Sequence, residues 1–192
     1  MPIREVQGSL CLVKLELSPA EIPNLRQIHA EKYPGACRLE ADGQALIETQ
    51  FDPRLSKEFV REVCEWGRGQ RFMDRIESSP EVIAKALSEG VDLVQKGWVA
   101  EGVERVRQLS YLGQSFASKQ LRFLVPSRVV ILDSVIRGRL GYTENVSGYS
   151  EFLADCCTVL ESVRKSTQLD EAYVAALRVC DIEAAIFAKV QG

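Results

Sequence analysis

Lys119 and Asp133 are two residues whose types and spacing suggest chemistry, and both belong to the segment LSYLGQSFASKQLRFLVPSRVVILD, residues 109–133. A lysine amine that is partly deprotonated can attack a sugar carbon and form a Schiff base. A carboxylate held by the amides of a helix start stays ionised and can stabilise positive charge developing on a sugar ring. The pair therefore indicates chemistry at a glycosidic carbon. The structural alternative is an exposed lysine and a simple helix cap, and the residue types alone favour that alternative.

The elements that must position these two residues can be predicted from the same segment. Gly113 predicts a tight turn between two helices, the second of which carries Lys119. The apolar run at 129–132 leads to Asp133, which we expect to cap the next helix. Because helix side chains lean toward the helix N-terminus, Lys119 should reach back over Ser115 toward the turn. The backbone amides at this helix start could then bind a phosphate.

The distribution of charge is uneven along the chain. Residues 105–139 contain seven basic residues and one acid, a surplus of six in a chain whose net charge is −3. A polyanion would be attracted to this segment and repelled elsewhere. A set of solvated helix faces would have the same composition, so this interpretation stays open beside the first.

Apolar residues at helical spacing predict an all-α protein of about eight or nine helices with short connections and no confident sheet. The most regular helical patterns cover residues 55–66, 80–96, 98–109, 134–141, 149–163 and 169–190, with a short helix at 70–76. A glycine at 90 suggests a kink in the second of these helices. We expect these residues to form a helical domain, 55–192, that contains the hairpin at 109–133.

The first 54 residues are less regular. Residues 9–17 partly alternate and predict a short strand or an extended arm, and a serine and a proline start a helix that should run over 18–33. Residues 35–54 have several glycines, aspartates and a proline, and predict a hairpin or a long loop. We therefore expect 1–54 to be an N-terminal arm and an irregular segment that pack on the domain.

Several classes of protein are excluded by composition. No apolar run approaches the ~20 residues of a membrane helix, and the N-terminus has no signal-peptide pattern, so we expect a cytoplasmic protein. The six cysteines are scattered and only one histidine, His29, accompanies them. We therefore expect no metal site, no iron-sulfur cluster and no cofactor, and we expect the thiols to be buried and reduced.

The segment resembles the helix-hairpin-helix DNA glycosylases. The closest resemblance is to the 8-oxoguanine DNA glycosylase branch and to small bacterial proteins of that fold, whose signature is similar to SFASKxLRFL followed by VxxLDSxI. Those motifs correspond to residues 115–124 and 129–136. The resemblance implies a helix-hairpin-helix DNA glycosylase-like helical bundle. It also implies an enzyme that flips a modified base out of duplex DNA, cleaves its N-glycosidic bond and can nick the strand by β-elimination.

The match is good at the aspartate and incomplete at the lysine. Asp133 corresponds to the family aspartate. The family lysine usually lies two residues after the last hairpin glycine, a place held here by Ser115, and Lys119 follows one turn later. Tyr111 takes the place of the first hairpin glycine, and Gly113 remains. Three interpretations follow: a relocated catalytic lysine, a monofunctional glycosylase that uses Asp133 with water, or an inactive relative that only binds.

The resemblance yields a set of expected site residues. Lys119 and Asp133 are the expected catalytic residues. The residues expected to contact DNA are Gly113, Gln114, Ser115, Ser118, Arg122 and Arg137. Weaker candidates for a base pocket are the aromatic residues Trp66, Trp98, Phe72 and Tyr142, which are better explained as core residues, and the charged residues Asp181, Arg178 and Glu183, which are equally explained as surface charges or a buried ion pair. The alternative functions are a non-catalytic nucleic-acid or nucleotide binding module and a protein-interaction domain with a decayed site.

Overall fold

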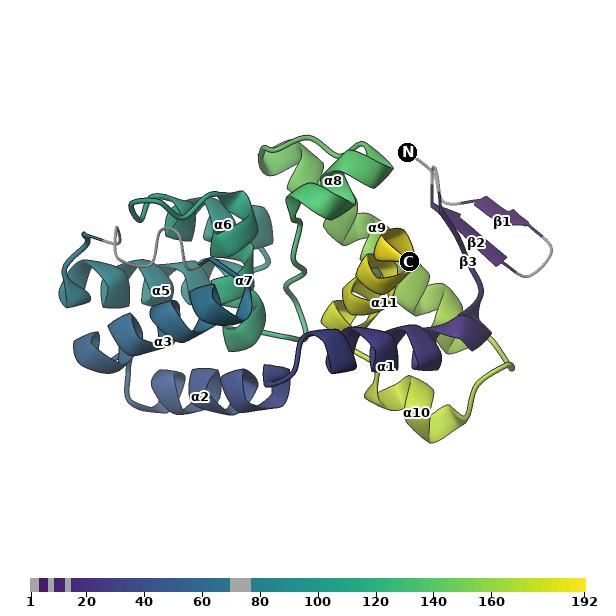
Figure 1. Ribbon diagram of the computed structural model, residues 1–192, viewed down its shortest axis with the longest axis horizontal. Helices are drawn as coiled ribbons and strands as arrows, with labels where there is room; N and C mark the ends of the chain where they lie inside the picture. The colour runs from purple at the N-terminus through teal and green to yellow at the C-terminus, as the bar shows by residue number, and fades with distance from the viewer. Residues whose placement is uncertain (1–3, 7–8, 13–14, 70–76) are drawn as a thin grey trace. The chain divides into compact units, whose positions relative to one another are not determined.

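The computed structural model describes residues 4–6, 9–12, 15–69 and 77–192 of the chain. The described residues are mostly helical, which confirms the predicted all-α character (Figure 1). The strands are β1 (Arg4–Val6), β2 (Ser9–Leu12) and β3 (Leu15–Leu17). A 3-10 turn, η1 (Pro19–Glu21), leads into the helices. These are α1 (Ile22–Lys32), α2 (Ala36–Glu48), α3 (Pro53–Trp66), α5 (Pro80–Gln95), α6 (Val99–Arg107), α7 (Gln114–Leu124), α8 (Ser134–Leu140), α9 (Val146–Lys165), α10 (Glu171–Ala176) and α11 (Val179–Gln191).

The chain divides into two compact units. Unit 1 consists of Met1–Lys32 and Leu132–Gly192, and unit 2 of Tyr33–Ile131. This division does not follow the boundary expected at residue 54. The reason is that α1 packs on α11, near the other end of the chain, while α2 packs on α3 and α7.

Unit 2 is a group of helices around α7. Helices α2, α3, α5 and α6 all contact α7. Helices α5 and α6 approach closely: a methyl group at Gly90 would lie 2.8 Å from Cγ2 of Val106, and one at Gly102 would lie 2.8 Å from the carbonyl oxygen of Gly90. Gly90 therefore serves close helix packing, and α5 continues through it to Gln95.

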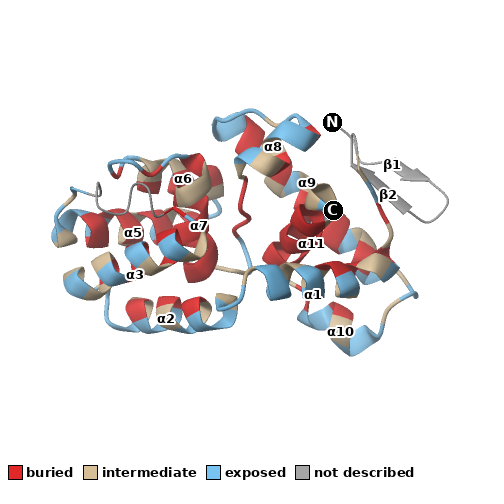
Figure 2. Ribbon diagram, in the orientation of Figure 1, coloured by how far each residue is buried: buried red, intermediate tan, exposed pale blue. Residues whose placement is uncertain are grey.

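Unit 1 is built around α11. Helices α1, α8 and α9 all contact α11, which is buried along almost its whole length (Figure 2). The three strands form an antiparallel sheet in the order β1-β2-β3, in which Leu10 pairs with Leu17. A strand at the N-terminus was one of the two predicted outcomes, and it is confirmed.

Two of the predicted elements are wrong. Residues 35–54 contain a regular helix, α2, because its Leu39, Gly43 and Leu46 are buried against neighbours that the local sequence does not reveal. The single helix expected over 169–190 is broken after α10. Leu177 has an extended backbone there, and Arg178 is the N-cap of the next helix, α11. The short helix expected at 70–76 lies outside the described residues.

None of the described helices has both the length and the apolar character that crossing a bilayer requires. Five of the cysteines are free thiols in the structure. Three of them are buried (Cys64, Cys156, Cys180) and two are exposed (Cys37, Cys157), so burial of all the thiols was too broad a prediction.

Candidate functional site

The turn between α6 and α7 forms the expected hairpin, with an unexpected backbone. The left-handed residue of the turn is Tyr111, at φ 66°, whereas Gly113 has a negative φ of −68° and caps α7. A tyrosine in this conformation costs roughly 1–2 kcal/mol relative to the right-handed region. Tyr111 is also exposed and occupies the place where the resembled family has its first hairpin glycine. The backbone thus keeps a glycine-like conformation although the glycine is missing.

Lys119 lies in the middle of α7 and is buried, with 7% of its surface exposed. Its amine donates a hydrogen bond to Oγ of Ser115 at 2.8 Å, which confirms the prediction that this side chain reaches back by one turn. The same nitrogen lies 4.9 Å from the ring centroid of Phe116, in the geometry of a cation–π contact. The amine is therefore held beside the first turn of α7.

The last turn of α3 covers the stem of Lys119. A methyl group at Gly67 would lie 2.9 Å from Cδ of Lys119, so the two residues are in close contact. Cys64, one turn earlier on α3, accepts a 3.7 Å hydrogen bond from Gln120. Burial raises the pKa of the Cys64 thiol to about 12, although the charge of Lys119 and the bond from Gln120 oppose the rise. Cys64 is therefore a protonated thiol near neutral pH and not a nucleophile.

The side of α7 that was expected to face DNA is packed inside the protein. Gln114, Ser118 and Arg122 are all buried. Ser118 donates its hydroxyl proton to the carbonyl of Ser115, and Arg122 donates to a carboxylate oxygen of Glu40 at 2.7 Å. These side chains are buried because four helices of unit 2 surround α7. In this structure these three side chains are therefore not accessible to DNA, contrary to the prediction. Gly113, in contrast, is exposed, and Ser115 is half-buried.

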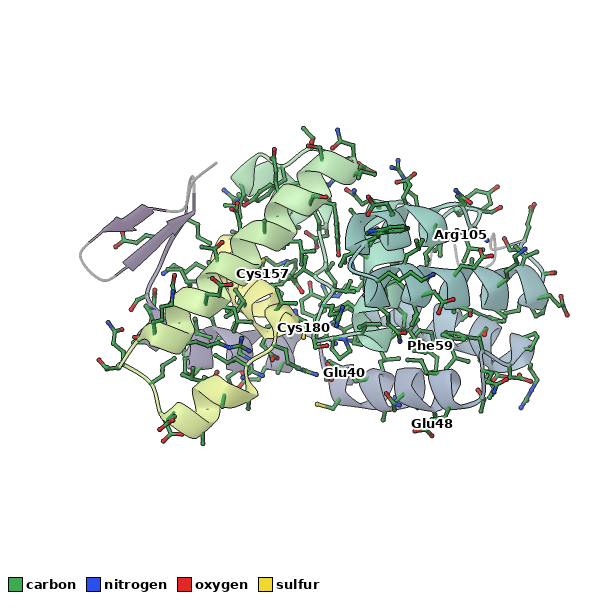
Figure 3. The ribbon with its side chains drawn as sticks, turned by 180° about the vertical axis from the view of Figure 1, so that it is seen from behind. Glu40, Glu48, Phe59, Arg105, Cys157 and Cys180 are labelled. Carbon is green, nitrogen blue, oxygen red and sulfur yellow. The ribbon has the colours of Figure 1, made fainter. Side chains whose placement is uncertain are left out.

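The local surplus of positive charge is largely neutralised. Besides Arg122 with Glu40, three arginines of the 105–139 segment form ion pairs: Arg105 with Glu89 at 2.5 Å, Arg107 with Glu104 at 3.3 Å and Arg137 with Glu144 at 2.5 Å. Glu40 belongs to α2 and Arg105 to α6 (Figure 3). All four partner carboxylates come from outside the segment. The segment is therefore a weaker attractor of polyanions than its composition indicates.

Asp133 is the N-cap of α8, which confirms the predicted helix start. Its Oδ1 accepts hydrogen bonds from the amides of Val135 and Ile136, each at 3.0 Å. The residue is half-buried. Both bonds use the same oxygen, so within the described residues Oδ2 accepts no hydrogen bond. The carboxylate is fixed in place with one oxygen available to a ligand.

The weaker pocket candidates are mostly engaged in packing. Trp66 packs edge-on against Phe123, with ring centroids 4.8 Å apart, and donates to the carbonyl of Tyr33. Trp98 is 58% exposed at the start of α6. Tyr142 donates its hydroxyl proton to Asp155 at 2.6 Å. Phe72 lies outside the described residues.

Asp181 and its neighbours at the start of α11 form a buried ionic cluster in unit 1. Asp181 accepts hydrogen bonds from Arg26 at 2.8 Å and from the backbone amide and side chain of Arg178. Glu183, two residues further on α11, is also buried. The cluster joins α1 to α11, so Arg178 and Asp181 contribute to packing within unit 1.

The structure thus gives each catalytic candidate a defined local environment. Lys119 belongs to unit 2 and Asp133 to unit 1. Gly67 and Phe116, which contact the lysine, were not predicted as site residues from the sequence. No group of three or more histidine, cysteine or acidic residues suited to a metal ion occurs in the part of the chain that the structure describes.

A small hollow of about 200 Å³ lies between α2 and α3 and is lined by Arg38, Asp42, Leu46, Phe59 and Glu62, among others. None of the predicted site residues lines it. Comparison with protein-family models, with curated proteins and with solved structures finds no match to this chain.

Proposed function

We propose that this protein is a DNA glycosylase with AP lyase activity, which excises an oxidised or otherwise modified base, such as 8-oxoguanine, from duplex DNA. The observation that carries the proposal is the position of the Lys119 amine, 2.8 Å from Oγ of Ser115. Ser115 stands where the resembled glycosylases have their lysine. A lysine four residues later on the helix therefore supplies an amine beside the same place, which favours the relocated catalytic lysine.

The chemistry follows from the two side chains. The neutral amine of Lys119 attacks C1′ of the extruded nucleotide, and the glycosidic bond breaks with its electron pair leaving on the base, which takes up a proton. Asp133, with Oδ2 directed to no partner within the described residues, stabilises positive charge on the sugar. Ring opening gives a Schiff base, β-elimination expels the 3′ phosphate, and water releases the lysine. These steps need no cofactor.

The hairpin supports this proposal independently of the lysine. Tyr111 keeps the left-handed backbone that a glycine would adopt, and Gly113 is exposed immediately before the first turn of α7. An exposed helix start can bind a DNA phosphate through backbone amides. Because most arginines of the 105–139 segment are paired, DNA contact in this proposal depends on the hairpin backbone more than on a basic surface.

The proposal can be tested by trapping a covalent adduct with borohydride on duplexes that contain 8-oxoguanine or an abasic site. Wild type should form an adduct, and Lys119→Ala should lose it. Lys96→Ala is the matched control, because Lys96 is an exposed lysine of the same unit and should leave the yield unchanged. An adduct that persists in Lys119→Ala would contradict the assignment of the nucleophile.

A second candidate function is a non-catalytic nucleic-acid or nucleotide binding module. The burial of Lys119 favours it, because a lysine with 7% exposure can be purely structural. DNA binding that survives both Lys119→Ala and Asp133→Asn, with no product from any modified duplex, would support this module over the enzyme. Absence of salt-dependent DNA binding would instead favour a protein-interaction domain.

A further inference from the structure

Gly67 ends α3 although its backbone does not require glycine. Its φ of −75° and ψ of 6° are accessible to any residue. A larger side chain at position 67 would not have enough space. A methyl group at Gly67 would lie 2.9 Å from Cδ and 3.1 Å from Cε of Lys119, and 2.9 Å from Cε1 of Phe116. The glycine therefore keeps open the volume that the lysine stem and the aromatic ring occupy.

The amine at the end of this stem is held on two further sides. It donates to Oγ of Ser115 at 2.8 Å and lies 4.9 Å from the ring centroid of Phe116. Ser115 and Phe116 are half-buried while Lys119 is buried, so solvent reaches the two residues that hold the amine. A free lysine side chain has many rotamers, so fixing it in advance removes the entropy of ordering it from the cost of reaction.

We infer that Gly67, Ser115 and Phe116 form an amine seat that positions Lys119 for attack on a sugar carbon. The three residues are positioning residues, since none of them is required to touch the reacting atoms. The chemical purpose of the seat rests on the proposed glycosylase function. Its geometry does not, because the seat holds the amine in the protein without DNA.

The variants that test the seat separate its three contacts. Ser115→Ala removes the hydrogen-bond acceptor, and Ser115→Thr retains a hydroxyl. Gly67→Ala fills the space of the stem. Gly138→Ala is the matched control, because Gly138 is a helical glycine around which a methyl group would meet nothing within 4 Å.

The first measurement needs no DNA. In protein labelled with [ε-¹³C]lysine, the Lys119 signal is assigned by its loss in Lys119→Arg. We expect this signal to stand apart from those of exposed lysines in wild type, Ser115→Thr and Gly138→Ala, and to shift toward them in Ser115→Ala and Gly67→Ala. A Lys119 signal that is the same in wild type, Ser115→Ala and Gly67→Ala would overturn the inference. Ser115→Ala is decisive if Gly67→Ala does not fold.

The second measurement is the single-turnover rate of borohydride-trapped adduct on a duplex with an abasic site. Misplacement of a reacting group by about 1 Å can cost up to a hundredfold in rate, so Ser115→Ala and Gly67→Ala should trap about 10 to 100 times more slowly. The rate of Gly138→Ala should stay near wild type, and Ser115→Thr should recover most of the rate that Ser115→Ala loses. If wild type forms no adduct, the proposed enzyme fails, and the lysine signals still decide whether the seat exists.

Discussion

Two aspartates at helix starts in unit 1, Asp133 and Asp181, use their carboxylates in different ways. Asp133 accepts two amide hydrogen bonds at the start of α8, both through Oδ1. Asp181 uses both oxygens near the start of α11: Oδ1 accepts from Arg26 and Arg178, and Oδ2 accepts from the amide and Nε of Arg178. Asp133 is half-buried, whereas only 5% of the surface of Asp181 is exposed.

This difference in hydrogen bonding indicates which of the two carboxylates can interact with a ligand. A charged oxygen whose acceptor capacity is already used by guanidinium and amide groups holds helices together. A carboxylate that is fixed through one oxygen can present the other oxygen to a developing positive charge. We therefore expect changes at Asp133 to affect activity more than stability, and changes at Asp181 to affect stability more than activity.

The largest expected effect is the loss of glycosylase activity in Asp133→Asn. Asparagine is as good an N-cap as aspartate, so the free energy of unfolding should change by less than about 0.5 kcal/mol. Loss of the charge should slow base excision by about a hundredfold or more, as removal of one preorganised electrostatic group does in other enzymes. Single-turnover excision and urea unfolding measure the two quantities on the same samples.

Asp52 provides a matched control for this prediction. Asp52 caps α3 by accepting from the amide of Leu55 at 3.0 Å, and Asp52→Asn should change neither excision nor stability. Equal excision rates for Asp133→Asn and wild type would remove the electrostatic role of Asp133 and with it the contrast between the two aspartates.

The next effect in size is destabilisation by Asp181→Asn. The change leaves Arg26 and Arg178 without their buried counter-ion, and breaking a fully buried pair costs about 3–5 kcal/mol. The side chains of Arg26 and Arg178 are 32% and 34% exposed, so hydration offsets part of the loss. We expect a decrease of about 2 kcal/mol in the free energy of unfolding, measured at pH 7 by urea denaturation.

The pH dependence of that decrease follows from the pKa of Asp181. Burial raises this pKa, but hydrogen bonds from Arg178 and the charges of Arg26 and Arg178 outweigh burial and lower it below its ordinary value of 3.8. A lowered pKa stabilises the fold above the unfolded-state pKa, and this contribution is lost as pH falls through the folded-state pKa. The difference between wild type and Asp181→Asn should therefore be full above pH 5 and shrink below pH 4. A constant difference down to pH 2 would show that charge is not its cause.

The smallest effect expected is on stability in Asp133→Ala, which removes the cap as well as the charge. Loss of an aspartate N-cap costs about 1 kcal/mol. Thermal unfolding should show this loss in Asp133→Ala and in Asp52→Ala alike, whereas only Asp133→Ala should lose excision. A larger loss in Asp133→Ala than in Asp181→Asn would reverse the comparison between the two residues.

The features predicted correctly from the sequence are those that depend on local geometry. The cap at Asp133 and the hydrogen bond from Lys119 to Ser115 each join residues within four positions, so helix geometry determines them. The burial of Arg122 could not be predicted in this way, because its partner Glu40 is 82 residues away. Glu40 also lies on α2, a helix whose sequence contains glycine and was expected to be irregular.

The break between α10 and α11 was hidden for a related reason. Residues 169–190 keep helical periodicity across the break, so the pattern alone predicts one helix. A second helix start is stabilised by the ionic cluster of Arg26, Arg178 and Asp181. This cluster includes Arg26, which lies 155 residues from Asp181 in the sequence. Periodicity identifies helices but contains no information on such distant partners.

The arrangement of unit 1 has a consequence for synthesis on the ribosome. Unit 2 is continuous in sequence, so it can fold once residue 131 has left the exit tunnel. Helix α1 must wait for α11, which is synthesised much later, and its Ile22 and Leu25 are buried in the folded protein. At about 5–20 residues per second, α1 remains without its partner for about 8–30 seconds, a period in which a chaperone can bind it.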